Sequence, residues 1–216
     1  DSPPISAQPR SAAEVVFGSF NSLAKLNRPL IRTWASILAA VPASRIVLKA
    51  ASLSYSDTAE RILECFEDYG IASERVELHG WIKGRREHLG LYNRIDIALD
   101  TYPYNGTTTT CESLWMGVPV VSLSGSAHMS RVGRTILRCA GLPELVAERT
   151  DEYVDIAVAL AHDQVRRLEL RTSLRNRLLC SPLLDHKGFT KELERQFRQC
   201  WTAWCDAQHQ SMPIIQ

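Results

Sequence analysis

The sequence predicts an α/β protein, with a doubly wound (Rossmann-like) parallel sheet and a C-terminal helical extension. Short apolar or β-branched runs alternate five or six times with amphipathic segments of helical spacing, as strands and helices do around such a sheet. Residues 95–100 form a nearly continuous apolar run, which is typical of a strand covered on both faces. Polar stretches rich in Gly, Pro, Ser and Asn separate the segments and predict the loops.

The individual elements follow from these patterns. Strands are expected at residues 14–20, 45–50, 75–80, 95–100 and 118–123. Helices are expected at about 27–41, 56–70, 84–93, 109–117, 130–139, 150–161, 164–179 and 188–205. In the first helix, Asn27 is placed to act as N-cap and Pro29 lies in the first turn.

Composition and charge argue against several classes of partner. The 216 residues carry a net charge of only +1, which gives no reason to expect nucleic acid or an anionic membrane as partner. No apolar run approaches the roughly 20 residues of a membrane span, and residues 1–13 lack the apolar core of a signal peptide. The six cysteines include no C-x-x-C pair, so neither a zinc site nor a disulfide framework is indicated. A reducing, cytoplasmic location fits best.

The ligand site is expected at one edge of the sheet. Right-handed crossovers bring the carboxyl ends of parallel strands to the same edge, where ligands of such folds bind. Four polar loops follow predicted strands, at residues 21–27, 80–88, 102–110 and 124–131. We therefore expect the chemistry to lie among these loops.

The stretch from Asn105 to Thr110, with the sequence NGTTTT, leads into a helix N-terminus. The first turn of a helix has unpaired N–H groups and a partial positive charge, so it attracts phosphate. Gly106 would let a ligand approach the backbone closely. A purely structural interpretation is equally open, because Thr109 and Glu112 have the spacing of a capping box. Glu112 could alternatively reach a ribose diol.

Three segments resemble a known family: FGSFNSLAK (17–25), LDTYPYNGTTTTCESLWMGVPVVSL (99–123) and SRVG (130–133). They are similar to the C-terminal catalytic lobe of the protein O-linked N-acetylglucosamine transferases, glycosyltransferase family 41, above all to its SPINDLY-like branch and bacterial tetratricopeptide-repeat relatives. The similarity runs from about Val15 to Trp204. It implies the two-lobed GT-B fold, in which the C-terminal lobe binds a nucleotide-sugar, while an N-terminal lobe and tetratricopeptide repeats supply much of the acceptor site.

With this resemblance, the chain divides into three parts. Residues 1–13 are expected to be a linker or flexible tail, and residues 14–180 a nucleotide-sugar-binding Rossmann-like domain. Residues 181–216 form a C-terminal helix and tail that pack toward the N-terminal lobe, so the apolar face of this helix should be exposed here. Because that lobe is not part of this sequence, we expect an incomplete enzyme that is inactive alone.

The resemblance also implies roles for residues. Lys25 matches a lysine on the donor diphosphate, where a cation would offset the charge of the leaving group; we treat it as the catalytic residue. Ser22 matches a polar residue that contacts the donor. His88 matches a histidine that packs against the base, and Arg85 lies near a base-contacting lysine.

The remaining donor-binding residues lie in two loops. The resemblance places Thr107, Thr108 and Thr109 on the phosphate-binding loop, together with the Asn105–Gly106 turn. His128 and Arg131 would contact the sugar, the phosphates or the acceptor, although Arg131 could equally cap a helix or pair with a carboxylate. Asp96 and Asp100, single carboxylates beside a strand, are expected to be structural.

The resemblance leaves the donor open. The animal transferases have histidine at the position of Thr107 and aspartate at that of Glu112, and a family arginine is replaced by Leu91. The first two differences are shared with the SPINDLY branch, which resembles protein O-fucosyltransferases that use GDP-fucose.

We expect an inverting transfer of N-acetylglucosamine from UDP-GlcNAc to Ser or Thr hydroxyls of proteins, with GDP-fucose or UDP-glucose as alternative donors. No metal or other cofactor is expected, since no D-x-D pair is present. A noncatalytic nucleotide-binding regulatory module is the alternative of another class. A dinucleotide oxidoreductase is disfavoured, because Gly18-Ser19-Phe20-Asn21 replaces G-x-G-x-x-G after the first strand.

Overall fold

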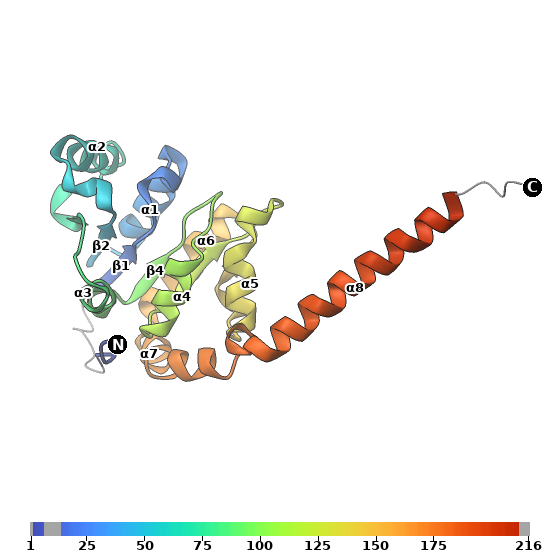
Figure 1. The fold of residues 1–216 in the computed structure, drawn as a ribbon. Coiled ribbons are helices and arrows are strands. Elements are labelled where there is room, and N and C mark those ends of the chain that lie inside the picture. The colour runs from blue at the N-terminus through green and yellow to red at the C-terminus, as the bar shows by residue number, and fades with distance from the viewer. Residues whose placement is uncertain (1, 7–13, 212–216) are drawn as a thin grey trace, which may run out of the picture.

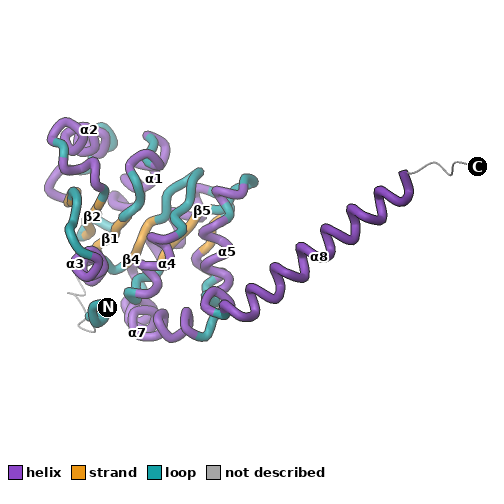
Figure 2. The backbone as a smooth tube through the Cα atoms, in the orientation of Figure 1, coloured by secondary structure: helices purple, strands orange, loops and turns teal. Residues whose placement is uncertain are grey.

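The computed structural model describes residues 2–6 and 14–211. Its centre is a six-stranded sheet of order β3-β2-β1-β4-β5-β6 in which every neighbouring pair is parallel (Figures 1 and 2). The strands are β1 (Val15–Ser19), β2 (Ser44–Lys49), β3 (Val76–His79), β4 (Ile97–Leu99), β5 (Val120–Leu123) and β6 (Val146–Ala147). The predicted doubly wound α/β class is confirmed.

Helices connect and flank these strands. They are α1 (Arg28–Ala40), α2 (Ser56–Glu67), α3 (Arg85–Leu91), α4 (Thr108–Trp115), α5 (Val132–Cys139), α6 (Thr150–His162), α7 (Gln164–Leu179) and α8 (His186–Ser211). Asn27 caps α1 as expected, since its Oδ1 accepts a 2.9 Å hydrogen bond from the Leu30 N–H. The prediction missed β6, because two residues are too few to show a strand period.

The strand order places the ligand edge. From β1 the chain winds outward to β2 and β3, and from β4 it winds the other way to β5 and β6. Right-handed crossovers in opposite directions put α1 and α2 on one face and α4 and α5 on the other. The direction reverses between β1 and β4, and a crevice outside the carboxyl ends of these two strands is where such sheets bind nucleotides.

The core is continuous across the sheet. All five residues of β1 and all three of β4 are buried. Trp34 of α1 is fully buried, and its indole N–H donates to the Tyr153 hydroxyl of α6 at 3.2 Å. Gly18 allows β1 to pack closely, because a Cβ there would lie 2.7 Å from the Ile95 side chain. This packing holds the ends of β1 and β4 at fixed positions.

The two ends of the chain differ. In the expected linker, Ser6 donates its backbone N–H to the Asn93 side chain at 3.0 Å, so residues 2–6 lie against the body of the domain. The rest of that linker, residues 1 and 7–13, falls outside the described residues, as do residues 212–216 of the expected C-terminal tail. At the other end, α8 extends away from the rest of the molecule (Figure 1). No helix among the described residues is both long and apolar enough to cross a membrane.

The apolar face of α8 is exposed, as expected for this helix. Its large apolar side chains recur at helical spacing and are 40–66% exposed: Phe189, Leu193, Phe197, Trp201 and Trp204. The rings of Trp201 and Trp204 stack with centroids 5.3 Å apart.

Candidate functional site

Asp100 organises the loop between β4 and α4. Its carboxylate accepts hydrogen bonds from the backbone N–H groups of Gly106 at 2.7 Å and Thr101 at 2.9 Å, and from the Ser122 hydroxyl at 2.7 Å. Burial raises the pKa of Asp100 to about 6, although these hydrogen bonds favour the charged form. Asp96 accepts the Val16 N–H at 2.9 Å. Both aspartates therefore have the structural roles expected of them.

The Asn105 side chain stabilises this loop from inside. It is fully buried, and its side-chain amide donates to the backbone oxygens of Thr101 at 2.9 Å and Leu123 at 3.3 Å. Its backbone N–H donates to Met129 O at 2.9 Å, which ties the loop to the turn after β5. Asn105 therefore shapes the loop from inside, and its backbone oxygen is also engaged, because it accepts a hydrogen bond from the Lys25 ammonium.

Gly106 is required by the packing of the loop itself. A Cβ at this position would lie 2.5 Å from Thr109 Oγ1, 2.8 Å from Thr110 Oγ1 and 2.9 Å from Asn21 Oδ1. The close approach that needs glycine is thus to the protein's own side chains, and the Gly106 N–H is already donated to Asp100.

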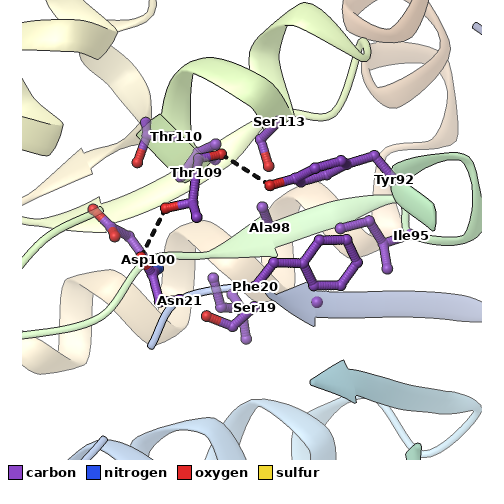
Figure 3. A pocket seen from close by; sticks show the side chains of 13 residues that line it. Ser19, Phe20, Asn21, Tyr92, Ile95, Ala98, Asp100, Thr109, Thr110 and Ser113 are labelled. Atoms are coloured by element: carbon purple, nitrogen blue, oxygen red, sulfur yellow. Dashed lines mark hydrogen bonds between the residues drawn. The ribbon is translucent and has the colours of Figure 1, made fainter. Parts of the chain in front are cut away.

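The four threonines after Gly106 divide into two pairs. Thr107 and Thr108 are exposed at the start of α4, whose first turn contains no acidic residue. Thr110 is buried, and Thr109 donates its hydroxyl to Asn21 Oδ1 at 2.7 Å, which ties α4 to the end of β1 (Figure 3). Because the first N–H groups of a helix lack intrahelical acceptors, Thr107 and Thr108 flank a place suited to an anion.

The capping box is not formed. The residue before α4 is Thr107, without a side-chain cap hydrogen bond, and Thr109 is committed to Asn21. Glu112 instead contacts α3: its Oε2 lies 3.0 Å from His88 Nε2 and 3.4 Å from the Tyr92 hydroxyl. The alternative capping role of Glu112 is therefore wrong, and this carboxylate stands between α3 and α4.

Lys25 lies beside the same loop. Its ammonium donates to Asn105 O at 2.8 Å and sits 4.0 Å from the centre of the Tyr104 ring. Partial burial lowers the pKa of Lys25 below its usual value, and the Asp100 carboxylate opposes this effect. A cation is thus held next to the segment that leads into α4.

Directly beneath the loop, the protein is filled. The pocket lined by Ser19, Tyr92, Asp100, Thr110 and their neighbours has a volume of about 10 Å³, which is room for one water molecule (Figure 3). It is far too small for a nucleotide. A nucleotide at this edge would therefore have to lie outside this pocket, and the surface at the start of α4 has a hollow beside it.

That hollow lies beside α3 and measures about 390 Å³. It is lined by Lys49, Trp81, Ile82, Gly84, Arg85 and His88. The rings of His88 and Tyr92 meet edge to face with centroids 5.7 Å apart, and Phe20 packs on Tyr92 at 4.5 Å, so His88 has a rigid support. Arg85 and His88 were expected here from the sequence, whereas Lys49 was not; its only signal was its position at the end of a strand at the ligand edge.

The other named residues lie on the surface of this edge. Ser22 is exposed just before the turn that carries Lys25, and its backbone oxygen accepts the Lys25 N–H at 3.0 Å. His128 and Arg131 are exposed near the Asn105–Met129 hydrogen bond. Arg131 immediately precedes α5 without a side-chain cap, and among the described residues it forms no salt bridge, so its two structural alternatives gain no support.

Within residues 2–6 and 14–211, no group of three or more His, Cys, Asp or Glu side chains is arranged to hold a metal ion. The expectation of metal-independent chemistry stays a prediction.

The family model and two curated relatives that match this chain are those of glycosyltransferases. The family model described as "Glycosyl transferase family 41" matches residues 8–193. A probable UDP-N-acetylglucosamine–peptide N-acetylglucosaminyltransferase SPINDLY from Petunia hybrida is 45% identical over 192 residues, which are 89% of this chain and 21% of the relative. The UDP-N-acetylglucosamine–peptide N-acetylglucosaminyltransferase of Caenorhabditis elegans is 31% identical over 200 residues, 93% of this chain and 17% of the relative. The chain thus spans about a fifth of the curated relatives it matches.

Solved structures agree on the fold. A Thermobaculum terrenum O-GlcNAc transferase mutant superposes with a TM-score of 0.84 at 40% identity, covering 95% of this chain and 40% of that one. Sucrose-phosphate synthase from Thermosynechococcus elongatus gives a TM-score of 0.60 at 20% identity over 90% of this chain and 47% of that one, a likeness of fold alone.

Proposed function

This chain belongs to glycosyltransferase family 41, and we propose that it is the donor-binding lobe of a protein O-glycosyltransferase. The proposed reaction transfers N-acetylglucosamine from UDP-N-acetylglucosamine to Ser or Thr hydroxyls of proteins. The names of the relatives from Petunia hybrida and Caenorhabditis elegans support this donor and a peptide acceptor. The N-terminal lobe and tetratricopeptide repeats of a longer chain are proposed as the partners that complete the acceptor site.

One arrangement carries the proposal: the hollow beside α3, the Glu112 carboxylate, the N-terminus of α4 and the Lys25 ammonium are linked by successive contacts. His88 lines the hollow and contacts Glu112, which is four residues after the first residue of the helix. Four residues span about 6 Å of helix, comparable to the span of a ribose. A base in the hollow would thus put its ribose at Glu112 and its diphosphate at Thr107 and Thr108.

Positive charge beside the diphosphate would support catalysis. When the acceptor oxygen attacks C1 of the sugar, the bond from C1 to the diphosphate breaks and its electron pair stays on the phosphate oxygen. Lys25 and the start of α4 would stabilise that negative charge, in place of a metal ion. Attack from the face opposite the leaving group inverts C1. The hydroxyl proton would leave to a base of the N-terminal lobe or through water to the phosphate.

Two alternatives remain in competition with this proposal. GDP-fucose is favoured as donor by Thr107 and Glu112, the positions where the sequence departs from the animal transferases. A noncatalytic nucleotide-binding module would keep the same hollow and helix terminus without transferring a sugar.

Calorimetric titration with UDP and GDP tests the proposal. We expect one nucleotide to bind, and Lys25→Met to weaken it about tenfold or more, since hydrogen bonds to charged groups are the strong ones. Lys191→Met removes an exposed lysine from α8 and should leave binding unchanged. Binding of GDP alone would move the donor to GDP-fucose.

If neither nucleotide binds to this chain or to the full-length protein, the donor-lobe proposal is wrong. Binding without transfer from UDP-N-acetylglucosamine or GDP-fucose by the full-length protein would favour the noncatalytic module.

A further inference from the structure

We propose that Lys49 reads the nucleotide base, by donating a hydrogen bond to a keto oxygen and thereby selecting keto bases over amino bases. The inference rests on the proposed function, since it assumes that the hollow beside α3 receives the base. It applies equally to uracil, whose keto oxygen is O4, and to guanine, whose keto oxygen is O6.

The fold aims Lys49 at the hollow. Lys49 is the last residue of β2 and lies at the carboxyl edge, in register with His79 of β3. Its half-buried side chain lines the hollow with Trp81, Ile82 and His88. Because β2 pairs with β1 on one side and β3 on the other, the sheet holds the backbone at Lys49 in place.

The ammonium of Lys49 has no hydrogen-bond or salt-bridge partner among the described residues. Burial lowers the pKa of Lys49 below its usual value, and the nearby Glu112 carboxylate opposes this shift only in part. Glu112 is directed to His88 and Tyr92, so it leaves the donors of Lys49 unused. A partly desolvated cation with unused donors gains most from a ligand that offers an acceptor.

The walls of the hollow suit a planar ring rather than a phosphate. Trp81, which is 70% exposed, Ile82 and His88 provide aromatic and apolar surface on which a base can stack. The loop that carries Trp81 is anchored, since the Trp81 N–H donates to Ser54 Oγ at 2.9 Å. The place suited to phosphate is the start of α4, on the far side of Glu112.

The chemistry of lysine sets the selectivity. An ammonium has three donors and no acceptor, so it favours a keto oxygen and disfavours the amino group that cytosine and adenine carry at the corresponding position. Arg85 is also a pure donor, but it is exposed at the rim of the hollow. Lys49 is the half-buried cation of the hollow, and we assign the discrimination to it.

The experiment measures dissociation constants for the pairs UDP/CDP and GDP/ADP. For the pair that includes the preferred nucleotide, the wild type should favour the keto base about tenfold or more. In Lys49→Met this preference should fall to within about threefold, whereas Lys49→Arg, which keeps a cationic donor, should retain it. The ratio within a pair cancels any general loss of attraction for the diphosphate.

Lys83→Met is the matched control, because Lys83 is an exposed lysine of the loop that carries Trp81 and does not line the hollow. It should keep the wild-type ratio. An unchanged ratio in a folded Lys49→Met protein would overturn the inference. Equal weakening of both members of the pair is one form of this result, and it would mean that Lys49 acts on Glu112 or the phosphates. If none of the four nucleotides binds this chain or the full-length protein, the proposed function fails first and the inference with it.

Discussion

His88 Nε2 lies 3.0 Å from Glu112 Oε2, and this contact joins α3, which lines the hollow, to α4, which begins at the proposed phosphate site. The Tyr92 hydroxyl approaches the same carboxylate oxygen at 3.4 Å, so Glu112 is held from two sides. A carboxylate in this position can orient the imidazole and still offer its other oxygen to a ligand.

Replacement of Glu112 should reveal whether it binds a ribose diol. We expect Glu112→Ala to weaken the preferred nucleoside diphosphate roughly tenfold, and to leave its 2′,3′-dideoxy analogue nearly unaffected, because the analogue lacks the groups that the carboxylate would accept. Calorimetric titration of both ligands measures the difference. Glu87→Ala, which removes an exposed carboxylate of α3, is the control. Equal losses for the two ligands would show that Glu112 acts only by orienting His88.

Asp100 should make stability depend on pH in an unusual direction. Its pKa is raised from 3.8 to about 6 in the folded protein. The contribution of Asp100 to stability is therefore fully present below pH 3.8 and is lost as the pH rises through about 6, by up to about 3 kcal/mol. In Asp100→Asn the amide can donate to Ser122 Oγ while its oxygen accepts the two N–H groups, so this variant should fold without that loss.

Urea unfolding between pH 4 and pH 7.5 measures the effect as the difference in free energy between wild type and Asp100→Asn. The variant should gain relative to the wild type as the pH rises. Asp206→Asn, on the exposed surface of α8, should show no such trend. A difference that stays constant with pH would mean that Asp100 titrates outside this range.

Gly106→Ala should disturb the loop without touching a ligand. The new Cβ would lie 2.5 Å from Thr109 Oγ1 and 2.9 Å from Asn21 Oδ1, the two atoms that tie α4 to β1. We expect a loss of about 1–3 kcal/mol in the free energy of unfolding and weaker binding of the diphosphate. Urea unfolding and calorimetry give the two quantities. Gly90→Ala in α3, whose Cβ would meet nothing within 4 Å, should be neutral or slightly stabilising. Wild-type behaviour of Gly106→Ala would show that the loop yields easily.

The features that could be predicted from the sequence are those that depend on residues close together in the chain. The cap at Asn27 needs only a neighbouring N–H, and the buried strands show their apolar pattern over several residues. The two-residue strand β6 has too little pattern to be seen. The same limit explains the false capping box: Thr109 and Glu112 have the right spacing, but partners 88 and 24 residues away along the chain claim their side chains.

The candidate site was harder to foresee where its geometry depends on packing. Asn105 and Gly106 belong to the loop that was named, yet buried contacts consume the Asn105 side chain and the Gly106 N–H. Lys49 carries no motif, and only the register of β2 and β3 brings it to the hollow with His88. The roles assigned to Lys25 and Thr107 stay predictions until a ligand is measured.

The exposed stripe on α8 leads to a prediction about the boundary of the domain. The helix extends away from the body, and Phe189, Phe197 and Trp201 are 63–66% exposed on it. Large exposed apolar surfaces of this kind mark contact sites or cause association. We expect a chain truncated after Asp185 to keep its nucleotide affinity and unfold within a few degrees of the longer chain, and to associate less at high concentration. Calorimetry, thermal unfolding and light scattering measure the three properties. A variant with Phe189, Phe197 and Trp201 all replaced by Gln is the matched control, since it keeps α8 but removes its apolar stripe, and it should scatter as little as the truncated chain. A truncated chain that no longer folds or binds nucleotide would place α8 within the domain and contradict a boundary near residue 181.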